Sequence, residues 1–143
     1  MTQKGTVQAD LYSLHGCVAE LGTKFARMRG KPSAIFMSTG TLANHLAIRT
    51  LAGKNSRVIV QNESHVYCDT GDSSQTLSQL NLIPLGANKA TFTLKEVQEV
   101  LEKNAIWRVA RKVGVISIES PVRQRRGELF DLQQMKKPAS LPD

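Results

Sequence analysis

The stretch TLANHLAIRTLAGKNSRVIVQ, residues 41–61, decides the fold because it places two different hydrophobic patterns next to each other. In its first part, Leu42 and Leu46 lie four residues apart, which is the spacing of an amphipathic helix. Gly53 gives this helix a natural end. After a short polar loop comes Arg57–Gln61, a β-branched run that is typical of a buried strand. We therefore expect a helix followed closely by a strand.

Helical and strand-like segments continue on both sides of this stretch. Helical spacing begins at Val18 and stops at Gly30, and the T-x-x-E pattern of Thr93 and Glu96 predicts a capping box ahead of another helix. Three further short apolar runs predict strands: Ser33–Ser38, Leu80–Leu85 and Val113–Glu119. The polar segment Asn62–Gln75 reads as a loop, and Asp131 is positioned to cap a last helix. Strands that alternate with helices predict an α/β fold with a mostly parallel sheet layered by helices, and Pro84 places its strand near an edge.

The bulk composition fits one domain with a mostly aliphatic core. The chain has 143 residues and a formal net charge of +7, but its 19 Lys and Arg residues are spread along the sequence. Basic charge without interleaved aromatic residues is a weak sign of nucleic-acid binding, so we expect no nucleic-acid partner. Two cysteines predict neither a zinc site nor a disulfide framework, which favours a cytoplasmic protein. The sequence shows no secretory signal and no membrane-spanning run, so no membrane partner is expected.

Small hydroxyl residues and a glycine stand between the predicted strand and the helix that follows it, in Ser38–Thr41. In open α/β sheets, ligands bind at the carboxyl ends of strands, and a helix N-terminus attracts phosphate groups. Gly40 would allow close approach, and Thr39 and Thr41 would add hydroxyl donors. The alternative is that one of these threonines only caps the helix.

Other chemistry-bearing residues follow the remaining strands. His65 is either a ring that stacks on or titrates against a ligand, or a surface histidine with a local hydrogen bond. Glu119 could hold a catalytic water, a ligand hydroxyl or a structural partner. Arg123, Arg125 and Arg126 are either anion ligands or a solvated basic face, and we favour the solvated face for at least two of them. Cys68 has no identifiable third group to orient a Cys–His pair, so we expect it to be inert.

Four blocks of the sequence, in order, resemble the low-specificity threonine aldolases and related β-eliminating lyases. These are enzymes that depend on pyridoxal 5'-phosphate and have the aspartate-aminotransferase fold. The resemblance runs from about Tyr12 to Lys137 and is carried by YSLHGCVAELGTKFARMRGKPSAIFMSTGTLANHLAIRT, RVIVQNESHVY, LNLIPL with KATFTLKEV, and VGVISIESPVR with GELFDLQQMKK. It implies a partial three-layer sandwich, the truncated large domain of fold type I, over residues 12–137. Residues 1–11 and 138–143 are then an N-terminal and a divergent C-terminal tail.

The resemblance also implies roles for individual residues. The residues implied to hold the cofactor phosphate are Thr39, Gly40 and Thr41. His65 would stack on the pyridine ring and act as a base, and Glu119 would be a second catalytic residue on the substrate side. Arg123 would bind either the substrate or the phosphate, and we favour the substrate. Many aldolases of this family carry a histidine where this chain has Pro121 and Val122, which points to a looser aldolase-like or β-eliminating relative.

The implied reaction is the cleavage of a β-hydroxy amino acid such as threonine to glycine and an aldehyde. In the family, the aspartate that pairs with the pyridine nitrogen and the lysine that binds the cofactor covalently come after the segment that ends at Lys137, and the sequence departs from the family at Pro138. We therefore expect these residues to be inactive alone. A non-catalytic fragment, or a partner subunit that binds cofactor phosphate or a full-length homologue of this homo-oligomeric family, is the alternative.

Overall fold

The computed structural model describes residues 15–131 and 133–134 of the chain. The chain divides into two compact units, Met1–Gly40 and Thr41–Asp143. The tails predicted for residues 1–11 and 138–143 lie outside the described residues, as does most of the helix predicted after Asp131. The prediction of one domain over residues 12–137 stays a prediction.

The first unit contains helix α1 (Gly16–Met28), where the sequence predicted a helix. Ala26 is the buried residue of this helix. The strand predicted at Ser33–Ser38 is wrong, because the described structure has no strand there. A strand is stable only when a neighbour completes its hydrogen bonds, and none of the described strands pairs with this segment. Ile35 and Phe36 are accordingly exposed rather than buried in a sheet.

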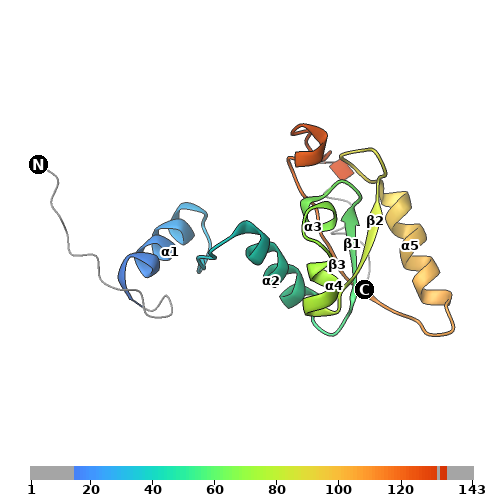
Figure 1. The fold of residues 1–143 in the computed structure, drawn as a ribbon, viewed down its shortest axis with the longest axis horizontal. Coiled ribbons are helices and arrows are strands. Elements are labelled where there is room, and N and C mark those ends of the chain that lie inside the picture. The colour runs from blue at the N-terminus through green and yellow to red at the C-terminus, as the bar shows by residue number, and fades with distance from the viewer. Residues whose placement is uncertain (1–14, 132, 135–143) are drawn as a thin grey trace, which may run out of the picture. The chain divides into compact units, whose positions relative to one another are not determined.

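The second unit is built on a three-stranded sheet with the order β2-β1-β3. Strand β1 (Arg57–Gln61) lies in the middle and pairs in parallel with both β2 (Asn81–Leu85) and β3 (Val113–Ile116), as Figure 1 shows. The predicted parallel sheet is therefore confirmed, and Pro84 does lie in an edge strand. Strand β3 ends earlier than predicted, so that Glu119 lies beyond the ladder.

Helices cover both faces of this sheet and make three layers. Helix α2 (Gly40–Ala52) and the short α3 (His65–Cys68) lie on one face, and α5 (Leu94–Ile106) lies on the other (Figure 1). One hydrophobic core lies on each face of the sheet. Alternate residues of β1 pack into one core or the other, because successive side chains of a strand point to opposite faces. The first core contains Ile48, Ala52, Val58, Val60, Val66, Leu80 and Leu82. The second contains Ile59, Phe92, Val97 and Phe130.

The capping box predicted at the start of α5 is present. Thr93 Oγ1 accepts a hydrogen bond from the Glu96 backbone N–H at 3.2 Å, and the Glu96 carboxylate accepts one from the Thr93 N–H at 2.7 Å. Two backbone donors that have no partner within the helix are thereby satisfied. The sequence pattern alone located this helix start.

The segment predicted as a loop, Asn62–Gln75, instead contains α3 and the start of a second short helix, α4 (Ser73–Ser78). The prediction failed because both helices are too short and polar to show helical hydrophobic spacing. Val66 is the buried residue of α3, and it packs into the first core.

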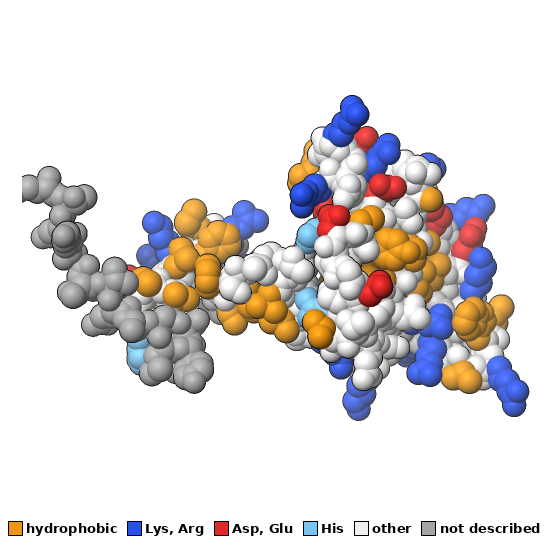
Figure 2. Space-filling model, in the orientation of Figure 1, with side chains coloured by type: hydrophobic (Ala, Val, Ile, Leu, Met, Phe, Trp, Pro, Cys, Tyr) orange, Lys and Arg blue, Asp and Glu red, His pale blue; other side chains and the backbone are white. Residues whose placement is uncertain are grey.

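The described surface carries its basic charge in scattered positions. On the face shown in Figure 2, Lys and Arg side chains are mixed with other residue types rather than gathered in one patch. In the described part of the chain, no helix combines the length and the apolar character that crossing a bilayer requires. The absence of a nucleic-acid partner stays a prediction.

Candidate functional site

A polar pocket of about 390 Å³ opens where β1 and β3 end, at the carboxyl edge of the sheet. Ligands of open parallel sheets bind at this edge, because the loops that follow the strands meet there. The pocket draws residues from α2, from the loop and helix after β1, and from the segment after β3. Its lining residues are Asn44, Ser64, His65, Val66, Ser117, Ile118, Glu119 and Arg123.

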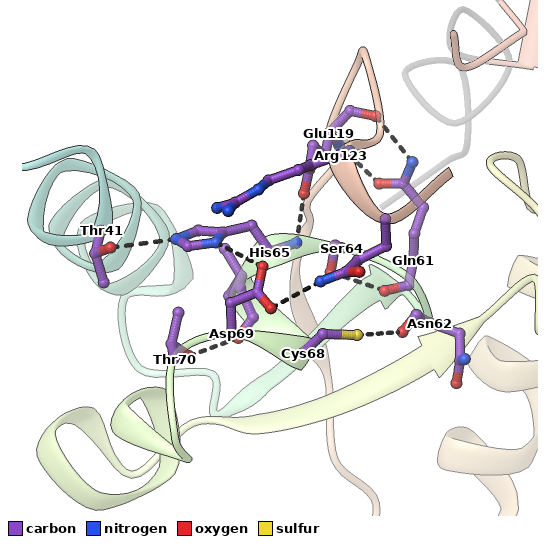
Figure 3. A network of polar contacts seen from close by, with 12 residues as sticks. Thr41, Gln61, Asn62, Ser64, His65, Cys68, Asp69, Thr70, Glu119 and Arg123 are labelled. Carbon is purple, nitrogen blue, oxygen red and sulfur yellow. Dashed lines mark hydrogen bonds and ion pairs between the residues drawn. The ribbon is translucent and has the colours of Figure 1, made fainter. Parts of the chain in front are cut away.

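His65 is the centre of the polar network in Figure 3. It is the first residue of α3, and its side chain is 25% exposed. Its ring atom Nε2 lies 3.2 Å from Thr41 Oγ1 in the first turn of α2, and its Nδ1 lies 3.1 Å from Asp69 Oδ2. The sequence predicted that the turn before α2 and this imidazole meet at one edge of the sheet. The structure brings Thr41 and His65 together as predicted.

Thr39 and Gly40 end the first of the two units, whereas Thr41 begins the second. Helix α2 starts at Gly40, which confirms that the glycine and hydroxyl residues stand at a helix N-terminus. The positive end of the helix dipole and the backbone N–H groups of the first turn favour an anion there. The part of Thr39 and Gly40 in holding a phosphate stays a prediction.

Glu119 uses both carboxylate oxygens to hold backbone amides. Its Oε2 accepts a hydrogen bond from the His65 N–H at 2.5 Å, and its Oε1 accepts one from the Arg123 N–H at 3.0 Å. His65 begins α3, and Arg123 begins the short 3-10 helix η1 (Arg123–Arg125). Of the three alternatives left open for Glu119, the structural partner is the one seen here. A catalytic role is a separate prediction, and the residue does line the pocket.

Gln61 holds the backbone next to the site through hydrogen bonds, and its role was not predicted from the sequence. It ends β1 and is fully buried. Its Nε2 donates to the carbonyl oxygens of Ala90 at 2.8 Å and Glu119 at 2.9 Å, and its Oε1 accepts from the Glu119 N–H at 2.7 Å. The available signal was a polar residue at the end of an otherwise apolar buried strand, because a buried amide needs partners.

The three arginines after β3 differ in their surroundings. Arg125 forms an ion pair with Glu128, with 3.6 Å between Nη2 and Oε1, and Arg126 is exposed. Arg126 fits the solvated face that the sequence favoured, whereas Arg125 is only partly exposed and its Nε is buried without a hydrogen-bond partner in the described part of the chain. Arg123 instead lines the pocket, and Figure 3 shows its side chain reaching toward the His65 ring. No interaction among the described residues engages its guanidinium group, which leaves this charge available to an anion.

Cys68 is not set up as a nucleophile. Its Sγ donates to the Asn62 carbonyl oxygen at 3.1 Å. Burial raises the pKa of the thiol, and the negative charges of Glu63, Asp69 and Glu119 raise it further. Because the thiolate is the reactive form, a raised pKa disfavours the group as a nucleophile, and the inertness of Cys68 stays a prediction. Within the residues that are described, no group of His, Cys, Asp and Glu side chains is arranged to hold a metal ion.

Comparisons with known proteins place the fold and the family. The family model of the beta-eliminating lyases matches residues 5–142. A candidate L-allo-threonine aldolase from Listeria monocytogenes EGD-E has a solved structure that matches with a TM-score of 0.77 and 28% identity, over 94% of this chain and 36% of that one. The solved structure of a candidate aromatic amino acid beta-eliminating lyase/threonine aldolase from Exiguobacterium sp. 255-15 matches with a TM-score of 0.74 and 21% identity. The match covers 96% of this chain and 37% of that one. No curated protein matches the chain. The chain thus spans little more than a third of these two structures.

Proposed function

Because this chain belongs to the beta-eliminating lyase family, we propose that its polar pocket is part of a pyridoxal 5'-phosphate site in a lyase of the threonine aldolase type. The observation that carries this proposal is the contact between Thr41 and His65 at the carboxyl edge of the sheet. A helix N-terminus that suits a phosphate and a planar imidazole that suits an aromatic ring lie next to each other there.

The residues of the pocket, together with Thr41, which contacts His65 but does not itself line the pocket, fit such a cofactor in their chemistry. Thr41 lies at the start of α2, where the helix dipole favours a dianion, and on binding its one hydroxyl proton would be donated to the phosphate instead of to His65 Nε2. His65 presents a flat ring for stacking. The guanidinium group of Arg123 is the kind of group that binds a carboxylate or a phosphate in a bidentate manner. We assign it to the carboxylate of an amino-acid substrate.

The proposed reaction is the cleavage of a β-hydroxy amino acid to glycine and an aldehyde. The bound cofactor would supply an electron sink for the negative charge that develops at the substrate Cα. In this scheme, the face of the His65 ring would lie against the cofactor ring, and its Nε2, at the edge of the ring, would accept a proton once the Thr41 hydroxyl donates to the phosphate instead. Glu119 keeps the backbone of His65 and Arg123 in place. The candidate L-allo-threonine aldolase among the structural relatives supports this substrate class. The resemblance places the lysine that binds the cofactor covalently beyond Lys137, so we propose that residues 1–143 alone bind the cofactor without turning over substrate.

The direct test is a titration of the full 143-residue chain with pyridoxal 5'-phosphate, followed by NMR of the backbone amides at the start of α2. We expect saturable shifts at Thr41 and His65, and weaker or no shifts with pyridoxal, which lacks the phosphate. Thr41→Val removes the hydroxyl and keeps the shape. It should weaken binding about tenfold or more, because hydrogen bonds to charged groups contribute about 1.5–3 kcal/mol.

Thr50→Val is the matched control, since Thr50 lies exposed further along the same helix. It should leave binding unchanged. Equal affinity for pyridoxal and pyridoxal 5'-phosphate would overturn the phosphate site. So would an affinity for pyridoxal 5'-phosphate that Thr41→Val leaves unchanged. Sustained release of glycine from L-threonine or L-allo-threonine by residues 1–143 would overturn the proposed lack of turnover.

A further inference from the structure

Asp69 joins His65 to a segment far away in the sequence. It follows the last residue of α3, one helical turn after His65, and its side chain is 26% exposed. Its Oδ2 lies 3.1 Å from His65 Nδ1, while its Oδ1 accepts a hydrogen bond from Gln124 Nε2 at 2.8 Å. Gln124 lies in η1, so both carboxylate oxygens are engaged and the side chain is fixed from two directions.

These contacts determine where the proton of a neutral His65 ring lies. An ionised carboxylate only accepts hydrogen bonds, so Nδ1 must carry the proton that it donates to Asp69. The neutral ring then has its lone pair on Nε2. Thr41 Oγ1, at 3.2 Å from Nε2, must be the donor in that contact. The same arrangement explains why the ring presents its acceptor nitrogen to the α2 side, because the carboxylate holds the opposite nitrogen.

We propose that Asp69 is a positioning residue that fixes the Nδ1–H tautomer of His65 and so keeps Nε2 as the proton-accepting atom of the pocket. Gln124 contributes by holding the Asp69 rotamer. A carboxylate that accepts a hydrogen bond from one ring nitrogen commonly sets which nitrogen of a histidine is protonated. The use of Nε2 as a base rests on the proposed function, whereas the tautomer itself is a property of the chain without ligand.

The test is therefore made on the ligand-free, full 143-residue chain labelled with ¹⁵N. Long-range ¹H–¹⁵N spectra distinguish the two tautomers, and the chain has only three histidines, so that a His65→Gln variant assigns the signals of His65. At about pH 8 imidazole rings are mostly neutral. We expect His65 to have a protonated Nδ1 and an unprotonated Nε2. In Asp69→Ala, the ratio of the two tautomers should move toward Nε2–H by several fold, and Gln124→Ala should give a smaller shift in the same direction.

Asp72→Asn is the matched control, since Asp72 is exposed, close in sequence and without a contact to His65 among the described residues, and Asn tolerates its φ of 58°. It removes the same charge and should leave the tautomer of His65 unchanged. A wild-type ring protonated on Nε2 would overturn the proposal without any variant, which covers the case in which Asp69→Ala does not fold. An unchanged tautomer in a folded Asp69→Ala protein would overturn it as well. Because no cofactor is added, these outcomes do not depend on whether the chain binds pyridoxal 5'-phosphate.

Discussion

At the scale of single residues, Glu119 links the strand end to both helical segments that form the pocket. A carboxylate that accepts two backbone hydrogen bonds cannot be replaced by an amide without loss, because the amide has one acceptor oxygen and one donor nitrogen. In Glu119→Gln, the NH₂ group must face the N–H of either His65 or Arg123. We therefore expect the amide proton of at least one of these two residues to exchange with solvent about ten- to hundredfold faster.

Site-resolved hydrogen exchange by NMR checks this expectation. Glu128→Gln is the control, since it removes the same charge from the surface pair with Arg125. It should leave the exchange of both amides as it was. Unchanged exchange at His65 and Arg123 in Glu119→Gln would show that the carboxylate does not hold the two backbone segments.

The sequence predicted some of the residues of this site from their chemical type. It missed others whose contacts depend on how distant segments pack. Thr41 and His65 were predicted as neighbours on the ground that each follows a strand of one sheet. In the described structure only His65 follows a strand, β1, whereas Thr41 reaches it from the first turn of α2, so the prediction of contact was right although half of its reason was wrong. The role of Gln61 could not, because its three partners come from loops whose positions depend on the packing of the whole sheet. Asp69 could not be predicted as a partner of His65, because their i,i+4 contact exists only if α3 forms, and the sequence did not predict this helix.

At the scale of elements, the start of α5 couples stability to pH. Burial raises the pKa of Glu96, but hydrogen bonds from Thr93 and Gly86 and the charge of Lys89 lower it, and the balance is a lowered pKa. Folding then favours the ionised carboxylate. Its contribution to stability is complete above the unfolded pKa of about 4.3 and is lost as the pH falls through the lower folded value.

Glu96→Gln should therefore reduce the free energy of unfolding by about 0.5–1 kcal/mol at pH 7, since Gln retains part of the capping box. The gap between wild type and variant should close as the pH falls through the lowered pKa of the wild-type carboxylate. Urea unfolding at several pH values measures both. Glu99→Gln, an exposed position on the same helix, serves as the control. A gap that is independent of pH would contradict the assignment of the lowered pKa to this cap.

The sequence predicted best those helices and strands whose formation is determined by residues within the element itself. Strand β1 was predicted with its observed bounds, because a β-branched run fits a strand that is covered on both faces. The strand at Ser33–Ser38 was predicted because a short apolar run is bounded by Pro32 and Gly40, and it is absent because this pattern does not reveal whether a partner strand is available. Helix α3 was missed because the carboxylate that accepts its first N–H comes from Glu119, 54 residues away.

At the scale of the whole molecule, the described helix of the first unit and the central strand of the second differ in how much apolar surface they bury. Val58, Ile59 and Val60 are completely buried at the centre of the second unit. In α1, Ala26 is the one residue of 13 that is buried. Isolated helices shorter than about 12–15 residues are marginal in water, so α1 gains little stability from packing of its own unit. Local opening should therefore require much less free energy in α1 than in β1.

Hydrogen exchange measured by mass spectrometry on the full chain tests this difference. We expect amides of β1 to exchange only through global unfolding of the second unit, and amides of α1 to exchange orders of magnitude faster. Val60→Ala should create a cavity in the first core and lower the free energy of unfolding by about 1–3 kcal/mol. Exchange should then accelerate at β1, because the free energy of global unfolding of the second unit falls. Exchange at α1 should stay the same if this helix opens independently of that unit. Equal protection of α1 and β1, or parallel acceleration of both by Val60→Ala, would mean that the two units unfold as one cooperative body.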